Sequence, residues 1–303
     1  MKTPRIKLPS GHLAQWRPDP LEAVMEADTA APASTFVTTP EQPAGPAGRQ
    51  RPADGQEEVM DVGRLAGQCV TILGAGSVGG YVARDLGPAR PVINLVDYKS
   101  VLIKHTHEGR TIYQADQVGT KKVYAAKEQI ERDYPGTVVR PFPYNVMELP
   151  ALEIRRMAAG SLLMMLAIDD PVAMLHVNDL VYRQVELIQV AMHARAMSGH
   201  IVVCLPGVTP CLRCTLEITR PDDIHRLDAE PGSAWHIQRV AHEAATIAME
   251  IMHAKVTGRP LTRWDLSKNL LYIANTREAM SPDGPGIHFE GSRKRPGCPI
   301  CST

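Results

Sequence analysis

A glycine-rich turn placed directly after a short apolar run constrains the fold of this chain more than any other feature. The run Val70-Thr-Ile-Leu73 leads into Gly74-Ala-Gly76-Ser-Val-Gly79, and residues 77–86 then have the apolar spacing of a helix. Strand, glycine turn and helix, in this order, surround a nucleotide phosphate with backbone N–H groups and a helix N-terminus. We therefore expect Gly74, Gly76 and Gly79 to bind a cofactor.

An acidic residue follows at the spacing that a nucleotide site requires. The apolar run 91–96 ends on Asp97, about 20 residues after the glycines, where a carboxylate can hold a ribose. A glycine turn alone is weak support, but the combination favours a nucleotide without distinguishing NAD from ATP. The predicted fold is an α/β, doubly wound Rossmann-like sheet, with further strands in 161–168, 185–192, 201–205 and 270–274 and helices in 120–134 and 235–257.

Four of the six cysteines form two short-spaced pairs, Cys211-Leu-Arg-Cys214 and Cys298-Pro-Ile-Cys301. Two such pairs suit the tetrahedral shell of a zinc ion better than two unrelated sets of buried thiols. Four thiolates leave no open coordination position for chemistry, so we expect a structural zinc in the C-terminal part. Cys69 and Cys204 remain, and their apolar neighbours indicate small buried side chains.

Composition excludes several classes of partner. Lys and Arg together number 33, as do Asp and Glu, so bulk charge gives no reason to expect nucleic acid or a membrane surface. No apolar run approaches the roughly 20 residues that cross a bilayer, and the first residues lack the apolar stretch of a secretory signal. We expect a cytoplasmic protein.

The start of the chain differs from the rest. Residues 27–56 are rich in Ala, Pro, Thr and Gly and have almost no bulky apolar side chain, so they cannot bury enough surface to fold alone. We expect residues 1–58 to form an extended N-terminal arm and linker, and residues 59–303 to form the folded domain.

Spacing alone leaves two interpretations open for several charged residues. Lys121 and Lys122 at a helix start, and Arg110 and His105 in the irregular stretch 98–117, are favoured as solvated surface residues. An irregular stretch of this length inside a compact fold is nevertheless typical of a functional loop. At the end of the strand 161–168, Asp169 and Asp170 precede Pro171, so capping of the next helix and metal binding are equally open.

Together these residues resemble the ThiF/MoeB family, the bacterial relatives of the ubiquitin-activating enzymes, from about Gly63 to Cys301. The resemblance lies in an ordered series of segments, which are 65–79 with the glycine turn, 95–97, 110–113, 118–122, 167–170 and 210–214.

The resemblance implies an activity and roles for individual residues. Members of the family use ATP and magnesium to adenylate the C-terminal glycine of a ubiquitin-like or sulfur-carrier protein, releasing pyrophosphate. Arg110, Lys122 and Asp169 would then be catalytic, with Asp169 also a magnesium ligand, while Asp97 would bind the nucleotide beside the three glycines. A homodimer and a conjugating-enzyme-like acceptor are also implied.

The chain departs from the family pattern in three places. The segment Lys104-His-Thr-His-Glu-Gly-Arg110 lacks the usual Asn, so His105 is expected to replace it at the cofactor. Met174 stands where the family has an arginine, and Arg49 or Arg51 is the candidate for an arginine donated across the dimer. The family's thioester-forming cysteine has no counterpart between Cys214 and Cys298, so we expect no enzyme-bound thioester.

Two other functions fit the same residues. One is an NAD(P)-dependent Rossmann dehydrogenase with a structural zinc. The other is a catalytically weak scaffold that keeps the fold to hold a ubiquitin-like protein, which the missing Asn and Met174 allow.

Overall fold

The computed structural model describes residues 60–302, apart from 108, 219–231, 262–266 and 278–284. The expected N-terminal arm, residues 1–58, lies outside the described residues, as do Arg49 and Arg51. None of the described helices has both the length and the apolar character needed to cross a membrane.

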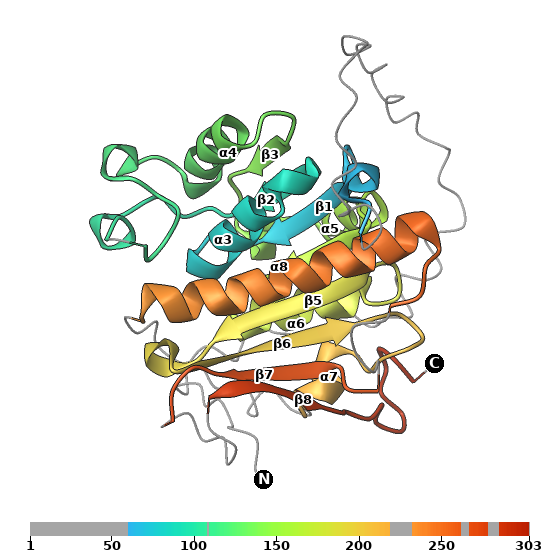
Figure 1. The fold of residues 1–303 in the computed structure, drawn as a ribbon. Coiled ribbons are helices and arrows are strands. Elements are labelled where there is room, and N and C mark those ends of the chain that lie inside the picture. Colours follow the sequence, from blue (N-terminus) through green and yellow to red (C-terminus); the bar gives the residue numbers. More distant parts are fainter. Residues whose placement is uncertain (1–59, 108, 219–231, 262–266, 278–284, 303) are drawn as a thin grey trace.

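The described residues contain one mixed sheet of eight strands, in the order β3-β2-β1-β4-β5-β6-β7-β8 (Figure 1). The first five strands in this order are parallel, and β6, β7 and β8 extend the sheet in antiparallel fashion. The strands are β1 (Cys69–Leu73), β2 (Val92–Val96), β3 (Val138–Phe142), β4 (Leu163–Leu166), β5 (Glu186–Met192), β6 (Ser198–Cys204), β7 (Leu270–Ala274) and β8 (Gly286–Glu290).

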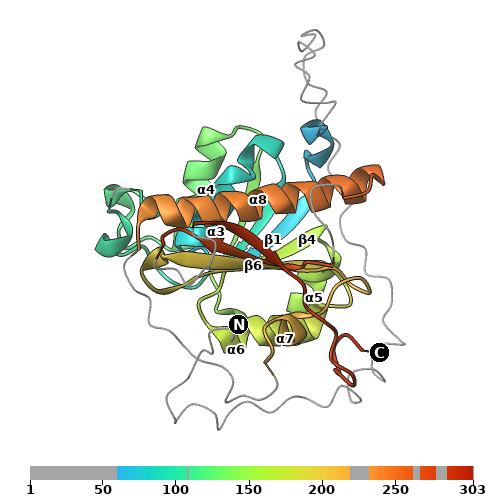
Figure 2. The ribbon, with the colours of Figure 1, turned by 60° about the horizontal axis from the view of Figure 1, so that its bottom comes forward.

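Helices cover both faces of the sheet, as expected for a doubly wound fold (Figures 1 and 2). Side chains on each strand alternate between two cores, so that Ile72 packs under one helix layer and Leu73 under the other. One layer consists of α3 (Ser77–Asp85), α4 (Lys122–Asp133) and α8 (Ala234–Thr257), and the other of α5 (Ala151–Ala159), α6 (Pro171–Val181) and the short α7 (Leu212–Thr215).

The parallel part of the sheet has a topological switch point between β1 and β4. These two strands are neighbours, but the strands that follow β1 in the chain, β2 and β3, lie on one side of them, and the strand that follows β4, β5, lies on the other. Open α/β sheets bind ligands at the carboxyl ends of the strands at such a point. The turn after β1 and Asp169 after β4 both lie at this edge, so the fold brings two of the expected site segments together.

The strands expected in the middle of the sheet are confirmed, whereas β3 and β8 were missed. These two strands are the edges of the sheet, and both are partly exposed. Edge strands have no continuous apolar run, and β3 even contains Pro141, which an edge strand tolerates. The sequence signal for a buried strand was therefore absent at both edges.

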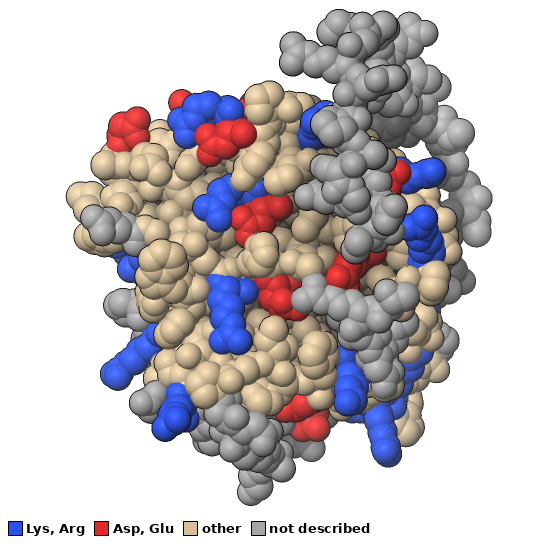
Figure 3. All heavy atoms as spheres, in the orientation of Figure 1, with Lys and Arg blue, Asp and Glu red and all other residues tan. Residues whose placement is uncertain are grey.

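Basic and acidic side chains are interspersed among the coloured atoms of the face in Figure 3. That face has no broad area of one sign, in line with the equal numbers of basic and acidic residues.

Candidate functional site

The glycine turn joins β1 to α3, and its glycines have different structural roles. Gly74 has φ of +99°, and a Cβ there would lie 2.3 Å from the carbonyl oxygen of Ala167. A Cβ on Gly79 would lie 1.9 Å from the carbonyl oxygen of Gly74. Both positions need glycine because the backbone is closely packed. Gly76, at the N-cap of α3, has open space instead, since a Cβ there would meet no described atom within 4 Å.

Asp97 supports this turn. Its Oδ2 accepts a hydrogen bond from the Ala75 N–H at 2.8 Å, and its Oδ1 accepts one from the Lys99 N–H at 2.8 Å. From the other side, the buried Tyr113 hydroxyl donates to the Ala75 carbonyl at 2.6 Å. A carboxylate oxygen has more than one acceptor position, so Asp97 holds the turn and keeps capacity for a further donor such as a ribose hydroxyl.

The loop that carries His105 and Arg110 is attached to two helices. The Tyr81 hydroxyl on α3 donates to the Gly109 carbonyl and also lies 3.2 Å from the Thr111 carbonyl. Gln238 on α8 donates from Nε2 to the same Gly109 carbonyl at 3.2 Å and to the Tyr81 hydroxyl at 3.1 Å. Arg110 is thus flanked by two anchored residues. Tyr81 and Gln238, which are 157 residues apart, belong to no motif that could have marked them in the sequence.

The two adjacent lysines at the start of α4 have opposite environments. Lys121 is exposed, and its ammonium group donates to the Tyr98 carbonyl at 2.6 Å. Lys122 is only 5% exposed, and burial lowers its pKa even though the nearby Asp97 carboxylate acts in the opposite direction. Among the described residues, nothing accepts a hydrogen bond from the Lys122 ammonium group. The surface interpretation is right for Lys121 and wrong for Lys122.

His105 is a neutral side chain in this group of cations. Its Nδ1 accepts a hydrogen bond from the Leu102 N–H at 2.9 Å, so the ring proton of the neutral form is on Nε2. Burial, followed by the nearby charges of Lys122, Lys104 and Arg110, lowers the pKa of His105 to about 4. At neutral pH it can therefore donate a hydrogen bond from Nε2 without adding another positive charge.

The two aspartates after β4 have different partners. Asp170 is the N-cap of α6, and its Oδ1 accepts hydrogen bonds from the N–H groups of Val172 at 2.9 Å and Ala173 at 3.4 Å. Asp169 makes no such bond, and its side chain is 62% exposed. Its carboxylate forms an ion pair with Lys99 at 3.1 Å. Of the two, Asp169 is the one whose carboxylate caps no helix and remains mostly exposed.

Lys99 was not identified in the sequence, although it stands only two residues after Asp97. Burial is the largest single influence and lowers its pKa, but the Asp169 carboxylate, together with Tyr98 and Asp97, raises the pKa overall. Lys99 therefore stays charged, and it joins Lys122 and Arg110 in the cation group at the carboxyl edge.

The departures from the family pattern have structural counterparts. Met174 on α6 is 5% exposed and packs in the core, so it contributes no polar group to the site. Cys204 is fully buried, and burial raises its pKa. Cys69 lies at the amino end of β1, opposite the glycine turn, where the Asn94 amide donates to its Sγ at 3.3 Å. Neither thiol is placed to act on a nucleotide-activated group.

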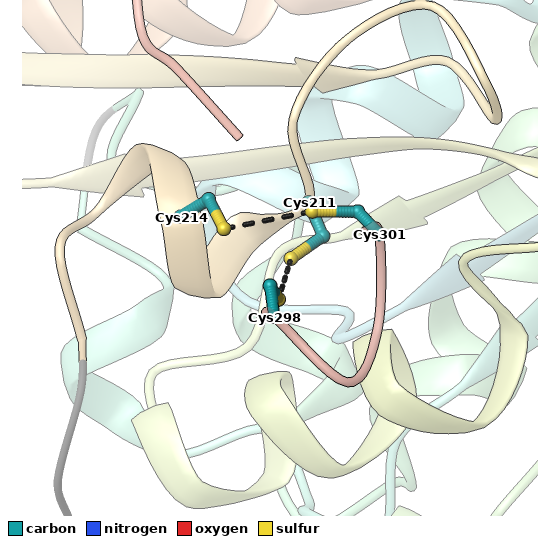
Figure 4. A group of neighbouring side chains, drawn as sticks. All are labelled: Cys211, Cys214, Cys298 and Cys301. Atoms are coloured by element: carbon teal, nitrogen blue, oxygen red, sulfur yellow. Dashed lines mark hydrogen bonds between the residues drawn. The ribbon is translucent and has the colours of Figure 1, made fainter. Parts of the chain in front are cut away.

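The four paired cysteines come together in a single buried cluster beneath the sheet (Figure 4). Their Sγ atoms all lie within 4.8 Å of one another, with 3.8 Å between Cys211 and Cys298 and 3.5 Å between Cys214 and Cys301. A zinc ion with bonds of about 2.3 Å to four sulfurs requires sulfur separations of about 3.8 Å. The donor set therefore fits a tetrahedral zinc.

The thiols of the cluster differ in how readily they ionise. Burial raises the pKa of Cys211 and Cys301. Burial also opposes ionisation of Cys298, but hydrogen bonds from the N–H groups of Cys301 and Ile300, together with those from the Cys214 and Cys301 thiols, lower its pKa to about 7. The Arg295 N–H donates to the Cys214 sulfur at 3.4 Å. The cluster connects α7 to the C-terminal segment, so a metal bound here would hold the end of the chain against the second helix layer.

The chain is similar in sequence to two curated proteins. Ubiquitin-like modifier-activating enzyme 5 of Caenorhabditis elegans and that of Caenorhabditis briggsae are each 27% identical to this chain over 168 residues, or 52% of its length. The alignments cover 39% and 38% of those proteins, so the chain spans about two fifths of the curated relatives it matches.

Solved structures show the same fold. Escherichia coli MccB with ATP aligns with a TM-score of 0.61 and 19% identity, covering 79% of this chain and 68% of MccB. The microcin C7 biosynthetic enzyme MccB in complex with N-formylated MccA aligns with a TM-score of 0.63 and 18% identity, covering 82% of this chain and 71% of that one. The sequence model of the ThiF family matches residues 54–283. Because this match covers well over half of the chain, the protein belongs to the ThiF family.

Proposed function

We propose that this protein is an ATP-dependent adenylyltransferase that activates the C-terminal carboxylate of a ubiquitin-like, sulfur-carrier or peptide substrate. One observation carries the proposal. The Lys122 side chain is only 5% exposed and its ammonium group donates to no described residue, and the charges of Lys122, Lys99 and Arg110 all act on His105. Membership of the ThiF family supports it, as do the name of the curated relatives and the ATP and MccA bound in the MccB structures.

Bringing cations together is unfavourable unless an anion offsets their charge. In adenylation, a carboxylate oxygen bonds to the α-phosphorus of ATP, and the bond from that phosphorus to the oxygen bridging to the β-phosphate breaks. Negative groups approach each other in this step, so nearby cations stabilise the transition state. Lys122 and Arg110 would supply these cations, and the Nε2 proton of His105 would supply a neutral donor. Hydride transfer to a nicotinamide requires no such group of cations.

The remaining parts of the proposal concern bound ions and partners. Magnesium would supply a Lewis acid at the phosphates, and Asp169 offers it an accessible carboxylate. Zinc would occupy the cluster of Cys211, Cys214, Cys298 and Cys301, and such a thiolate site suits the reducing cytoplasm. A homodimer, and an acceptor resembling a conjugating enzyme, follow from the family.

Nucleotide binding tests the proposal first. We expect ATP with magnesium to raise the melting temperature of the full chain, and NAD or NADP to leave it unchanged. Stabilisation by a nicotinamide nucleotide alone would favour the dehydrogenase instead.

Pyrophosphate exchange into ATP then tests the chemistry. The substrates to be tried are small proteins ending in glycine that are encoded beside this gene, together with peptides of their last ten residues or so. Exchange that depends on one of them would establish adenylation. ATP binding without exchange for any of them would favour the scaffold.

A further inference from the structure

The ion pair between Lys99 and Asp169 lies across the expected phosphate site. Lys99 follows β2 and Asp169 follows β4, and these two strands flank β1, from which the glycine turn emerges. Neighbouring strands are about 4.8 Å apart, so the two residues approach each other from strands roughly 10 Å apart. The Lys99 ammonium group contacts both carboxylate oxygens of Asp169, at 3.2 and 3.1 Å.

The backbone of Lys99 is fixed, whereas its side chain is free to move. The Lys99 N–H donates to Asp97 at 2.8 Å, and its carbonyl accepts from the Lys122 N–H at 3.0 Å. Residue 99 therefore links the proposed ribose carboxylate to the start of α4. The side chains of Lys99 and Asp169 are 40% and 62% exposed. Ion pairs this exposed contribute little to stability, so a stronger ligand can separate them.

A phosphate is such a ligand. The triphosphate of ATP carries several negative charges and Asp169 carries one, so the Lys99 ammonium group is attracted more strongly to the phosphates than to its partner in the exposed ion pair. We propose that Lys99 is a further nucleotide-binding residue, whose ammonium group moves from Asp169 to a phosphate group of ATP when the nucleotide binds. In the nucleotide-free protein Asp169 holds the lysine beside the site. This inference rests on the proposed function, because it requires that the site binds ATP.

The exchange makes two opposite predictions for ATP affinity. Removing Lys99 removes a phosphate contact, so Lys99→Ala should raise the Kd for ATP about tenfold. Neutralising Asp169 should have the opposite effect on ATP affinity when no magnesium is present. Asp169→Asn releases Lys99 and removes a negative charge facing the phosphates, so it should tighten metal-free ATP binding by up to about fivefold.

The experiment is isothermal titration of ATP into the full chain, in EDTA and again with magnesium. The variants are Lys99→Ala, Asp169→Asn and the double variant. Lys121→Ala is the matched control for a lysine, because Lys121 is exposed nearby and bonded to the Tyr98 carbonyl. Asp170→Asn is the control for the carboxylate, since asparagine still caps a helix. We expect both controls to bind ATP as the unmodified protein does.

The double variant separates a phosphate contact from a purely structural ion pair. If Lys99 contacts phosphate, Lys99→Ala weakens ATP binding about tenfold in the Asp169→Asn background as well. If Lys99 only restrains Asp169, its removal has no effect in that background, and the inference is overturned. An ATP affinity within about twofold of the unmodified protein for Lys99→Ala also overturns it. If the unmodified protein binds no ATP with magnesium, the proposed function itself fails and this inference fails with it.

Discussion

The carboxyl edge of the sheet and the cysteine cluster handle polar groups in opposite ways. At the edge, Lys122 is buried with a lowered pKa, and the exposed pair of Lys99 and Asp169 can open. In the cluster, four buried sulfurs converge on one point, and neighbouring N–H groups donate toward Cys298 and Cys214. The carboxyl edge suits an anion that binds reversibly, whereas the cysteine cluster suits a metal ion that stays bound.

This difference has an energetic meaning. Burial and the neighbouring lysines lower the pKa of Lys122 despite the opposite effect of Asp97 and Asp169, so a phosphate bound beside it would stabilise the folded chain. A closed four-sulfur site has no open position, so a metal bound there would contribute to folding and not to chemistry. Changes at the edge should therefore affect binding and rate, and changes at the cluster should affect stability.

The largest expected effect is on the cluster. Cys301→Ser, or removal of zinc by a chelator, should lower the melting temperature by roughly 10 °C or more, because the metal holds the C-terminal segment against α7. Calorimetry and metal analysis of the same sample measure both quantities, and we expect about one zinc ion per chain. Cys69→Ala, outside the cluster, is the control. A metal-free protein with an unchanged melting temperature would contradict the structural role.

At the edge, Lys122→Ala should raise the barrier to pyrophosphate exchange by about 2–4 kcal/mol, a slowing of roughly thirtyfold to a thousandfold, as expected for loss of one preorganised charge. Its melting temperature should stay the same or rise, because burial of the Lys122 side chain disfavours its charged form. Lys121→Ala is the internal control. Equal exchange rates in the two variants would mean that burial of Lys122 has no connection with the reaction.

The adjacent residues Asp169 and Asp170 allow an effect on rate to be distinguished from an effect on stability. Asp170→Ala should lower the free energy of unfolding by about 1 kcal/mol, because α6 loses its cap. Asp169→Ala should leave stability unchanged and reduce exchange at least about tenfold, since a cation ligand is lost. Urea unfolding and exchange assays on both variants measure the two effects. The reverse assignment, with Asp170→Ala inactive and Asp169→Ala active, would shift the expected magnesium ligand by one residue.

The smallest expected effect concerns the attachment of the loop that carries Arg110. Tyr81→Phe removes the hydroxyl bonded to Gly109, so we expect kcat to fall by about 3- to 10-fold, the value of one hydrogen bond. The KM for ATP should change less than kcat if the loop only orients Arg110. Tyr124→Phe, on the exposed side of α4, is the control. A fall in melting temperature that accompanies the same loss of rate would indicate general destabilisation instead.

Features encoded by neighbouring residues were predictable from the sequence. The turn from Gly74 to Gly79 needs glycine because the backbone packs on itself there, and the spacing of the apolar run, the glycines and Asp97 indicates this turn directly. The two cysteine pairs were equally clear, because each pair lies within one short turn. In both cases the residues that determine the geometry are close in the chain.

Features that depend on distant residues were not predictable in this way. The pairing of Lys99 with Asp169 joins residues 70 positions apart, and the contact of Gln238 with Gly109 spans 129. The edge strands β3 and β8 have no continuous apolar run, and they join the sheet through pairing with β2 and β7.

The sequence by itself determined the order of strands and helices around the glycine turn, the acidic residue after β2 and the four cysteines that cluster together. Only the tertiary structure decided that Lys122 is buried while Lys121 is exposed, and that Asp170 caps a helix while Asp169 remains accessible. Adjacent residues of the same type have nearly the same local signal. Their burial and their hydrogen bonds are set by segments that the fold brings in from elsewhere in the chain.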